Sequence, residues 1–137
     1  MADPKHVVER HVAAFNAKDA DAEPWSQDAE FVAPNASMRG REEVLGFLGV
    51  MWEAFPDGRL ETSRLLVEGS DVAAEGRFIG THTGVMRTPE GEIPATGRQV
   101  EFRWMSSYEV RGEELASEHL YFDQAELLGQ LGLMPTP

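Results

Sequence analysis

Three side chains that can move protons lie close together near the C-terminus: His119, Tyr121 and Asp123. In an extended strand, residues two positions apart project from the same face. A base, a phenol and a carboxylate would therefore share one surface, which is the composition of a pocket that transfers protons. We predict that Asp123 and His119 are catalytic residues and that Tyr121 contacts the substrate.

Asp123 also has a simpler structural interpretation. A leucine-rich run follows it and predicts a short helix over residues 124–131, for which aspartate is a favoured N-cap residue. An unperturbed aspartate, with a pKa of ~3.9, is a weak base for a carbon acid. An apolar cavity would raise that pKa by desolvation. Capping and catalysis are compatible, and on this stretch alone capping is the simpler interpretation.

Two further side chains are candidates for the wall of such a pocket. His82 lies between Thr81 and Thr83 in a glycine-flanked strand, where a purely structural role is the alternative. Trp52 belongs to a predicted helix over residues 41–55 with an unusually wide apolar face. A wide aromatic face is typical of a ligand pocket, although ordinary core packing explains it equally well. We predict that His82 and Trp52 bind the substrate.

The composition limits the function. The 137 residues form a single domain, 1–137, and the net charge of −12 argues against binding to nucleic acid or anionic membranes. The absence of cysteine excludes thiol catalysis and disulfides. No signal-peptide pattern and no run of about 20 apolar residues is present, so we expect a cytoplasmic protein with no membrane partner.

Cofactor and metal sites are not predicted. The four histidines, at positions 6, 11, 82 and 119, do not have the spacing of metal ligands. Glycine-rich phosphate-binding loops are absent. The expected chemistry is therefore acid/base catalysis by side chains alone.

The order of the predicted elements indicates the fold class. Helices are predicted over residues 4–18 and 41–55, with a short strand over residues 30–33 between them. From residue 59 the hydrophobic period changes to two, which predicts strands over 60–67, 72–84, 100–110 and 115–122 before the last helix. The prolines and glycines of residues 86–98 predict a long hairpin loop there. This is an α+β fold, a curved antiparallel sheet wrapped around N-terminal helices with an internal pocket.

Six short sequence blocks, in this order, carry a resemblance to a known family. They are GREEV at 40–44, AFPDG at 54–58, GTHTG at 80–84, PATGR at 94–98, YFD at 121–123 and QLGL at 130–133. With them the chain resembles the SnoaL-like polyketide cyclases, within the nuclear-transport-factor-two-like superfamily that also contains ketosteroid isomerase. The blocks cover nearly the whole sequence and imply a cone-shaped α+β barrel.

The resemblance also implies roles for particular residues. In the family's cyclases the aspartate before the final helix is the general acid/base of an aldol closure, and here this is Asp123. An asparagine after the first short strand lines the cavity there, which corresponds to Asn35. A His and a Gln on the penultimate strand are not kept, because Ser107 and Glu109 stand in their places; Ser107 is then a substrate-binding candidate. The superfamily's habit of pairing through the outer sheet face implies a homodimer.

Two inferences disagree about the strand 100–110. The family's spacing directs Ser107 and Glu109 inward, whereas the hydrophobic alternation directs Trp104 and Tyr108 inward. A bulge could also change the facing midway along the strand. The sequence leaves both orientations open.

The functional prediction is a small cofactor-free enzyme of the aldol cyclase, isomerase or hydrolase type. Its partner would be a small apolar or aromatic metabolite that carries a carbonyl group. Two alternatives remain: a non-catalytic domain that binds small molecules in the same cavity, and a structural dimerisation domain with a filled interior.

Overall fold

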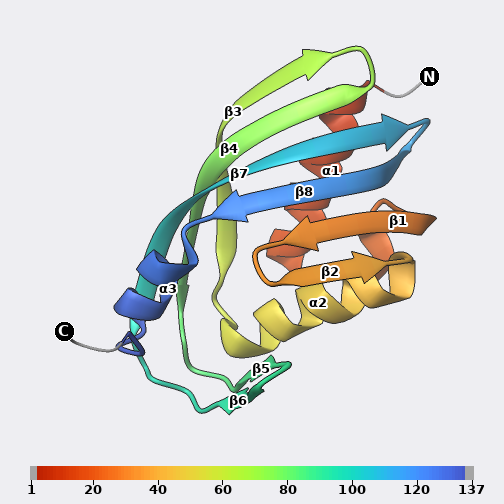
Figure 1. Ribbon diagram of the computed structural model, residues 1–137. Helices are drawn as coiled ribbons and strands as arrows, with labels where there is room; N and C mark the ends of the chain where they lie inside the picture. Colours follow the sequence, from red (N-terminus) through yellow and green to blue (C-terminus); the bar gives the residue numbers. More distant parts are fainter. Residues whose placement is uncertain (1–2, 135–137) are drawn as a thin grey trace.

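The computed structural model describes residues 3–134, which form a curved sheet around two long helices (Figure 1). The helices are α1 (Pro4–Ala17), the short 3-10 helix η1 (Ala20–Ala22), α2 (Arg41–Ala54) and α3 (Gln124–Gln130). The strands are β1 (Trp25–Ala33), β2 (Ala36–Arg39), β3 (Arg59–Glu68), β4 (Asp71–Thr81), β5 (Met86–Thr88), β6 (Gly91–Ile93), β7 (Gln99–Arg111) and β8 (Glu114–Phe122). The predicted α+β class is confirmed.

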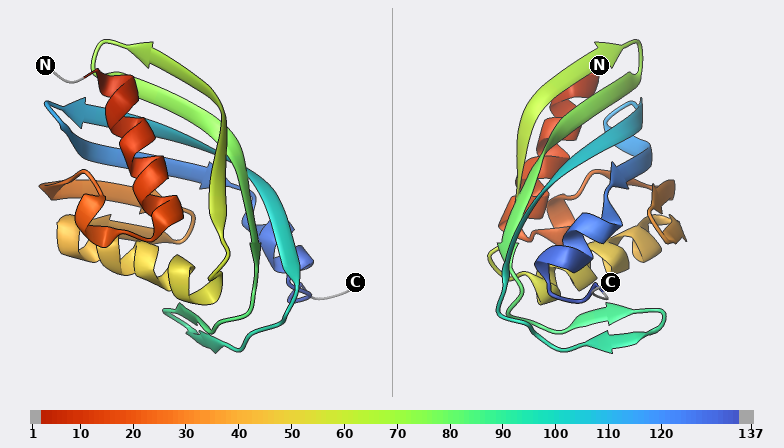
Figure 2. Two further views of the ribbon diagram at one scale, coloured as in Figure 1. Left: turned by 180° about the vertical axis from the view of Figure 1, so that it is seen from behind. Right: turned by 60° about the vertical axis from the view of Figure 1, so that its left-hand side comes forward.

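The main sheet has six strands in the order β2-β1-β8-β7-β4-β3. It bends strongly, and α1 and α2 lie on its concave side (Figures 1 and 2). The strand pairs are antiparallel except β1 with β8, which run parallel, so the sheet is mixed where a purely antiparallel one was expected. The parallel pair is possible because α2 and six strands, β2 to β7, separate β1 from β8 in the sequence.

Helix α1 is built by its capping residues and one apolar face. Asp3 caps it through the backbone N–H of Lys5, Pro4 occupies its first turn, and Lys18 ends it in a left-handed conformation. The helical spacing buries His11 on the same face as Val8 and Phe15. A polar ring is thereby carried into the apolar interior.

The first part of the sheet is longer than predicted. β1 extends back to Trp25 rather than beginning at residue 30, and the unpredicted β2 pairs with it as a hairpin. Asn35 adopts the left-handed conformation at the turn, with a φ of 65°, which asparagine tolerates better than most residues. The hairpin places Asn35 at one end of the concave face.

The orientation of β7 is decided by its burial pattern. Every second residue is buried without a break along the strand, and Trp104, Ser106 and Tyr108 all face inward. Ser107 and Glu109 therefore face outward, and the orientation based on the hydrophobic alternation is the right one. In the described part of the chain no helix is long and apolar enough to cross a membrane.

Candidate functional site

The concave face of the sheet and the two long helices enclose a cavity of about 480 Å³. Side chains from α1, α2, β1, β4, β7 and β8 line it, and most of them are apolar. Its aromatic wall includes Phe15, Phe31, Phe78, Phe102, Trp104 and Phe122. The hollow interior contradicts the third possibility, a filled dimerisation domain, and it supplies the predicted pocket.

A buried polar cluster interrupts this apolar wall. Glu118 of β8 and His11 of α1 both line the cavity, and His11 Nε2 lies 3.6 Å from Glu118 Oε1. The Ser106 hydroxyl donates to Glu118 Oε2 at 2.6 Å. The residue Glu118 is only 3% exposed, and its Oε1 has no hydrogen-bond partner among the described residues. An apolar pocket thus contains one carboxyl group with hydrogen-bonding capacity to spare.

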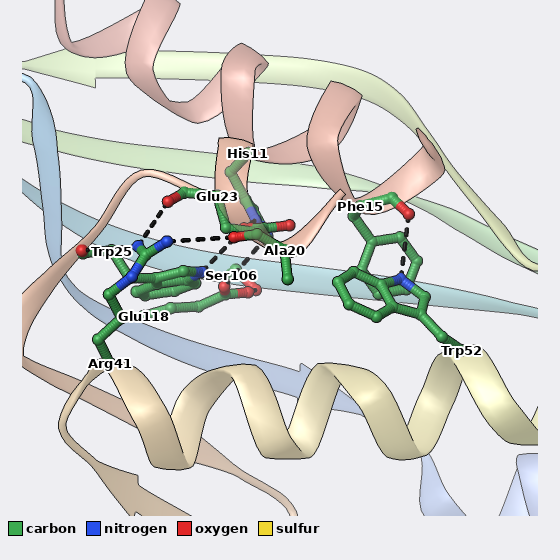
Figure 3. A network of polar contacts seen from close by, with 9 residues as sticks. All are labelled: His11, Phe15, Ala20, Glu23, Trp25, Arg41, Trp52, Ser106 and Glu118. Atoms are coloured by element: carbon green, nitrogen blue, oxygen red, sulfur yellow. Dashed lines mark hydrogen bonds and ion pairs between the residues drawn. The ribbon is translucent and has the colours of Figure 1, made fainter. Parts of the chain in front are cut away.

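His11 is held in place from its other side. Its Nδ1 lies 2.6 Å from Glu23 Oε1, and the Trp25 indole donates to the same oxygen at 2.9 Å (Figure 3). Both Glu23 and Trp25 are buried. The contacts form a continuous chain from Trp25 through Glu23 and His11 to Glu118, which fixes the imidazole ring beside the Glu118 carboxyl group.

Burial shifts the proton affinity of these groups. Burial raises the pKa of Glu118 above its ordinary value of 4.5, although the attraction of His11 and the hydroxyl hydrogen bonds act in the opposite direction. For His11 burial acts to lower the pKa, but the charge and hydrogen bond of Glu23, together with Glu118, outweigh it and raise the pKa above 6.5. Glu118 is therefore a better proton acceptor than an exposed glutamate.

Two side chains of α2 hold the neighbours of the buried cluster, one on the segment that carries Glu23 and one on α1. The Arg41 guanidinium donates to the backbone oxygens of Ala20, Glu23 and Trp25, at 3.1, 2.6 and 3.0 Å (Figure 3). Farther along α2, the Trp52 indole donates to the Phe15 carbonyl at 3.1 Å. The position of the buried cluster is therefore set by both helices.

Polar contacts join several of the segments that line the cavity. The Asn35 amide donates to the Gln124 side chain at 2.6 Å and joins the β1–β2 turn to α3. On another side lies the β5–β6 hairpin, which adds small strands to the loop predicted over residues 86–98. Its Arg87 is tied to Glu53 and Glu92 at 3.0 Å each.

The predicted orientation of β8 is wrong. Glu118, Leu120 and Phe122 line the cavity, whereas His119 and Tyr121 face outward. His119 lies on the sheet exterior with its Nε2 2.9 Å from Glu30 Oε1, and Tyr121 is 62% exposed. The two residues pair across the outer face with Ser107 and Met105, so Ser107 also lies outside the cavity.

Asp123 lies where β8 ends, and it is exposed and absent from the cavity wall. Its carboxylate accepts from the Glu126 backbone N–H at 3.2 Å and caps α3. The structural interpretation of Asp123 as an N-cap is confirmed, and the expectation that it points into the pocket is corrected.

Of the remaining predicted site residues, one lines the cavity and two do not. Asn35 is among the residues that line the cavity, and its role in substrate binding stays a prediction. Trp52 is not part of the cavity wall but packs on Phe15, and its indole bonds that residue's carbonyl. His82 is fully buried beside Phe55 and away from the cavity. Its Nδ1 accepts from the Thr96 backbone N–H at 3.2 Å, so His82 ties the hairpin loop to β4.

The sequence places His11 on the inward face of its helix, but sequence reasoning missed Glu118 and the contacts that His11 makes with Glu23 and Glu118. A signal was available for Glu118, because it shares its strand face with Leu120 and Phe122, and a glutamate on an apolar face is unusual. The contact of His11 with Glu23 had no comparable signal, because the loop between α1 and β1 sets it. Within residues 3–134 no group of three or more His, Asp or Glu side chains is arranged to hold a metal ion.

Comparisons with known proteins agree with this architecture. No curated protein matches the chain significantly. A SnoaL-like protein from Jannaschia sp. CCS1 is 19% identical with a TM-score of 0.83, covering 96% of this chain and 93% of that chain. IdmH from Streptomyces antibioticus, a candidate polyketide cyclase, is 24% identical with a TM-score of 0.79, covering 96% of this chain and 99% of that chain.

A third solved structure, from Catenulispora acidiphila, has a ketosteroid isomerase-like fold and was crystallised with trimethylamine. It is 22% identical with a TM-score of 0.78, covering 96% of this chain and 97% of that chain. At such identities these structures show a shared fold alone. The family model of SnoaL-like polyketide cyclases, however, matches residues 5–131, nearly the whole sequence. The chain therefore belongs to the SnoaL-like polyketide cyclase family.

Proposed function

We propose that the protein is a cofactor-free acid/base enzyme that acts on an apolar, carbonyl-bearing metabolite, with Glu118 as the group that takes and returns the proton. The observation that carries this proposal is the buried Glu118 carboxyl group at the cavity wall, with a raised pKa and a free oxygen. A carboxyl group in apolar surroundings has the proton affinity that transfer from a carbon acid needs.

The proposed reaction begins with loss of a proton from the carbon next to the substrate carbonyl. The C–H bond breaks, the proton passes to Glu118, and the electron pair moves to the carbonyl oxygen as an enolate. In a β,γ-unsaturated carbonyl compound the enolate is conjugated with the C=C bond, and return of the proton from Glu118 to the γ carbon gives isomerisation. In a substrate with a second carbonyl, attack of the enolate carbon on it forms the new C–C bond and an alkoxide, which takes the proton back from Glu118 to give the cyclised alcohol. His11 lies 3.6 Å from Glu118 and favours its charged form, which supports repeated loss and gain of the proton.

The catalytic role predicted for Asp123 and His119 stays a prediction, and the same experiment tests it. Wild type, Glu118→Gln, Asp123→Asn and His119→Asn would be incubated in D2O with simple neutral ketones such as 1-tetralone. Exchange of the protons next to the carbonyl would be followed by NMR. Glu118→Gln should lower the protein-dependent exchange rate by about 10²–10⁴-fold, the usual contribution of a general base.

The control variants make the outcome specific. Asp123→Asn and His119→Asn change an exposed and a half-buried residue outside the cavity, and both variants should stay within about threefold of wild type. If only Asp123→Asn lowered the exchange rate, Asp123 would be the catalytic residue, as predicted from the sequence, and the role proposed for Glu118 would be wrong.

A second candidate function is a non-catalytic domain that binds small molecules, and the apolar cavity itself favours it. Such a domain needs the aromatic wall but no proton transfer. Ketone binding by the wild type, with no exchange above the protein-free rate, would support the binding domain and contradict the enzyme.

A further inference from the structure

The three tryptophans of the chain differ in what their indole N–H groups bind. The Trp25 N–H donates to Glu23 Oε1 at 2.9 Å, and the Trp52 N–H donates to the Phe15 carbonyl at 3.1 Å. The Trp104 N–H is buried and has no hydrogen-bond partner within residues 3–134. An indole nitrogen can only donate, so neither rotation nor a tautomer can satisfy it otherwise.

Trp104 stands in the wall of the cavity that contains Glu118. It projects inward from β7 and is only 5% exposed. Phe102, two residues before it on the same strand face, packs against Phe78 and Phe122 with ring centroids 5.3 and 5.1 Å apart. Trp104 therefore has aromatic neighbours along its strand and across from it, Phe102 and Phe122, and a buried donor left without a partner is expensive.

The charges of the cavity limit which acceptor can serve. The two lining cations in the described chain, His11 and Arg87, are each already paired with carboxylates. The other charged lining groups are Glu43, Glu90 and Glu118. An anionic ligand would meet these carboxylates without a free cation, so a neutral oxygen is the acceptor that suits the site.

We propose that Trp104 is a ligand-binding residue whose indole N–H donates to a neutral carbonyl or ether oxygen of the bound molecule, and that it selects such molecules over hydrocarbons of the same shape. The inference rests on the proposed function only in placing the ligand oxygen in the cavity that contains Glu118. Binding at Trp104 does not require that a reaction follows.

The test uses a matched pair of probes, 2-acetylnaphthalene and 2-ethylnaphthalene, which differ in the carbonyl oxygen. Indole N–H signals of ¹⁵N-labelled protein would be assigned with Trp104→Phe and Trp52→Phe and followed by NMR during titration with each probe. The ketone should move the Trp104 proton signal downfield, while the Trp25 and Trp52 signals, already hydrogen-bonded, stay nearly in place. The hydrocarbon should produce no such shift.

Affinities from the same titrations give a second readout. Wild type should bind the ketone about three- to tenfold more tightly than the hydrocarbon, the range of one neutral hydrogen bond. Trp104→Phe keeps an aromatic ring and should reduce this ratio to about one, whereas Trp52→Phe should keep it. An unchanged ratio in Trp104→Phe, or a ketone that binds without moving the Trp104 signal, would overturn the proposal.

A further titration separates the binding role of Trp104 from the catalytic role of Glu118. The titration is repeated with Glu118→Gln, which leaves the indole intact. A Trp104 shift that persists in a variant without proton exchange supports the binding role on its own. A Trp104 signal that stays fixed while wild type still catalyses exchange would contradict this inference and leave the role of Glu118 standing.

Discussion

At the scale of single residues, the cluster of His11, Glu23 and Glu118 is the costliest feature of the interior. Three titratable groups are buried together, with the imidazole between two carboxyl groups. Burying charged groups is unfavourable unless they are paired and hydrogen-bonded. The arrangement reduces this penalty by pairing His11 with Glu23 and by raising the pKa of Glu118, which favours its neutral form.

Replacing His11 by asparagine should therefore destabilise the protein strongly. Glu23 would keep the Trp25 hydrogen bond but lose its charged partner, and breaking one side of a buried pair costs about 3–5 kcal/mol. Because folding raises the pKa of His11 above 6.5, its contribution is fully present below pH 6.5 and is lost as the pH rises through the folded-state pKa. The cost of His11→Asn should thus be largest in mild acid.

Urea unfolding at several pH values measures this effect. His119→Asn is the matched control, because His119 makes a similar contact with a glutamate on the exposed face. Its unfolding midpoint should change little, since exposed pairs contribute little. Equal losses in the two variants, or a His11→Asn loss that grows as the pH rises, would contradict the assigned pairing.

At the scale of elements, much of the fold could be predicted from hydrophobic periodicity. The two long helices and the four long strands follow patterns that local sequence contains. The unpredicted β2 and the backward extension of β1 depend on pairing with partners, which no single stretch reveals. The site was less predictable, because its polar residues come from α1, the segment before β1, and two strands.

Strand β8 shows why the site was harder to predict than the fold. The trio at 119, 121 and 123 predicts that the odd-numbered residues face inward, whereas the apolar Leu120 and Phe122 predict that the even-numbered residues do. The structure follows the apolar alternation, and the chain leaves the strand before Asp123, which then caps α3. Hydrophobic burial determines which strand face is inward, so chemical side chains are better sought among the exceptions on that face, such as Glu118.

Alanine substitutions at two glycines test how closely the hairpin loop approaches α2. A Cβ added at Gly84 would lie 1.8 Å from the Glu53 carbonyl oxygen, at the end of α2. Gly84→Ala should push the hairpin loop from α2 and destabilise the protein by about 1–3 kcal/mol, the usual cost of overpacking. At Gly49, inside α2, a Cβ meets nothing within 4 Å, so Gly49→Ala should stabilise by about 0.5–1 kcal/mol.

Thermal and urea unfolding of the two alanine variants provide the comparison. Opposite signs are expected for the same chemical change, which controls for a general effect of alanine. A Gly84→Ala protein as stable as the wild type would mean that the loop and α2 do not approach as closely as described.

At the scale of the whole molecule, the outer sheet face remains to be explained. The dimer expected from the family resemblance stays a prediction. The outer surface offers Leu66, Met105 and Tyr121, which are 52%, 48% and 62% exposed, and Met105 and Tyr121 are cross-strand neighbours. Apolar side chains grouped on one face suit contact with a second copy of the chain.

Light scattering after size-exclusion chromatography tests this prediction. Wild type should elute as a dimer, and Met105→Glu should shift it toward the monomer, because it buries a charge in the contact. Glu75→Gln, a neighbouring exposed change that removes charge, serves as the control and should leave the dimer intact. A monomeric wild type at high protein concentration would end the dimer prediction.

The account depends most directly on the proton affinity of one carboxyl group inside the cavity. Titration of the Glu118 side-chain carboxyl carbon by NMR, assigned with Glu118→Gln, measures it. We expect a pKa above the ordinary 4.5, raised mainly by burial. A pKa at or below 4.5 would show that burial does not dominate the proton affinity of Glu118, and it would contradict the acid/base role proposed for it.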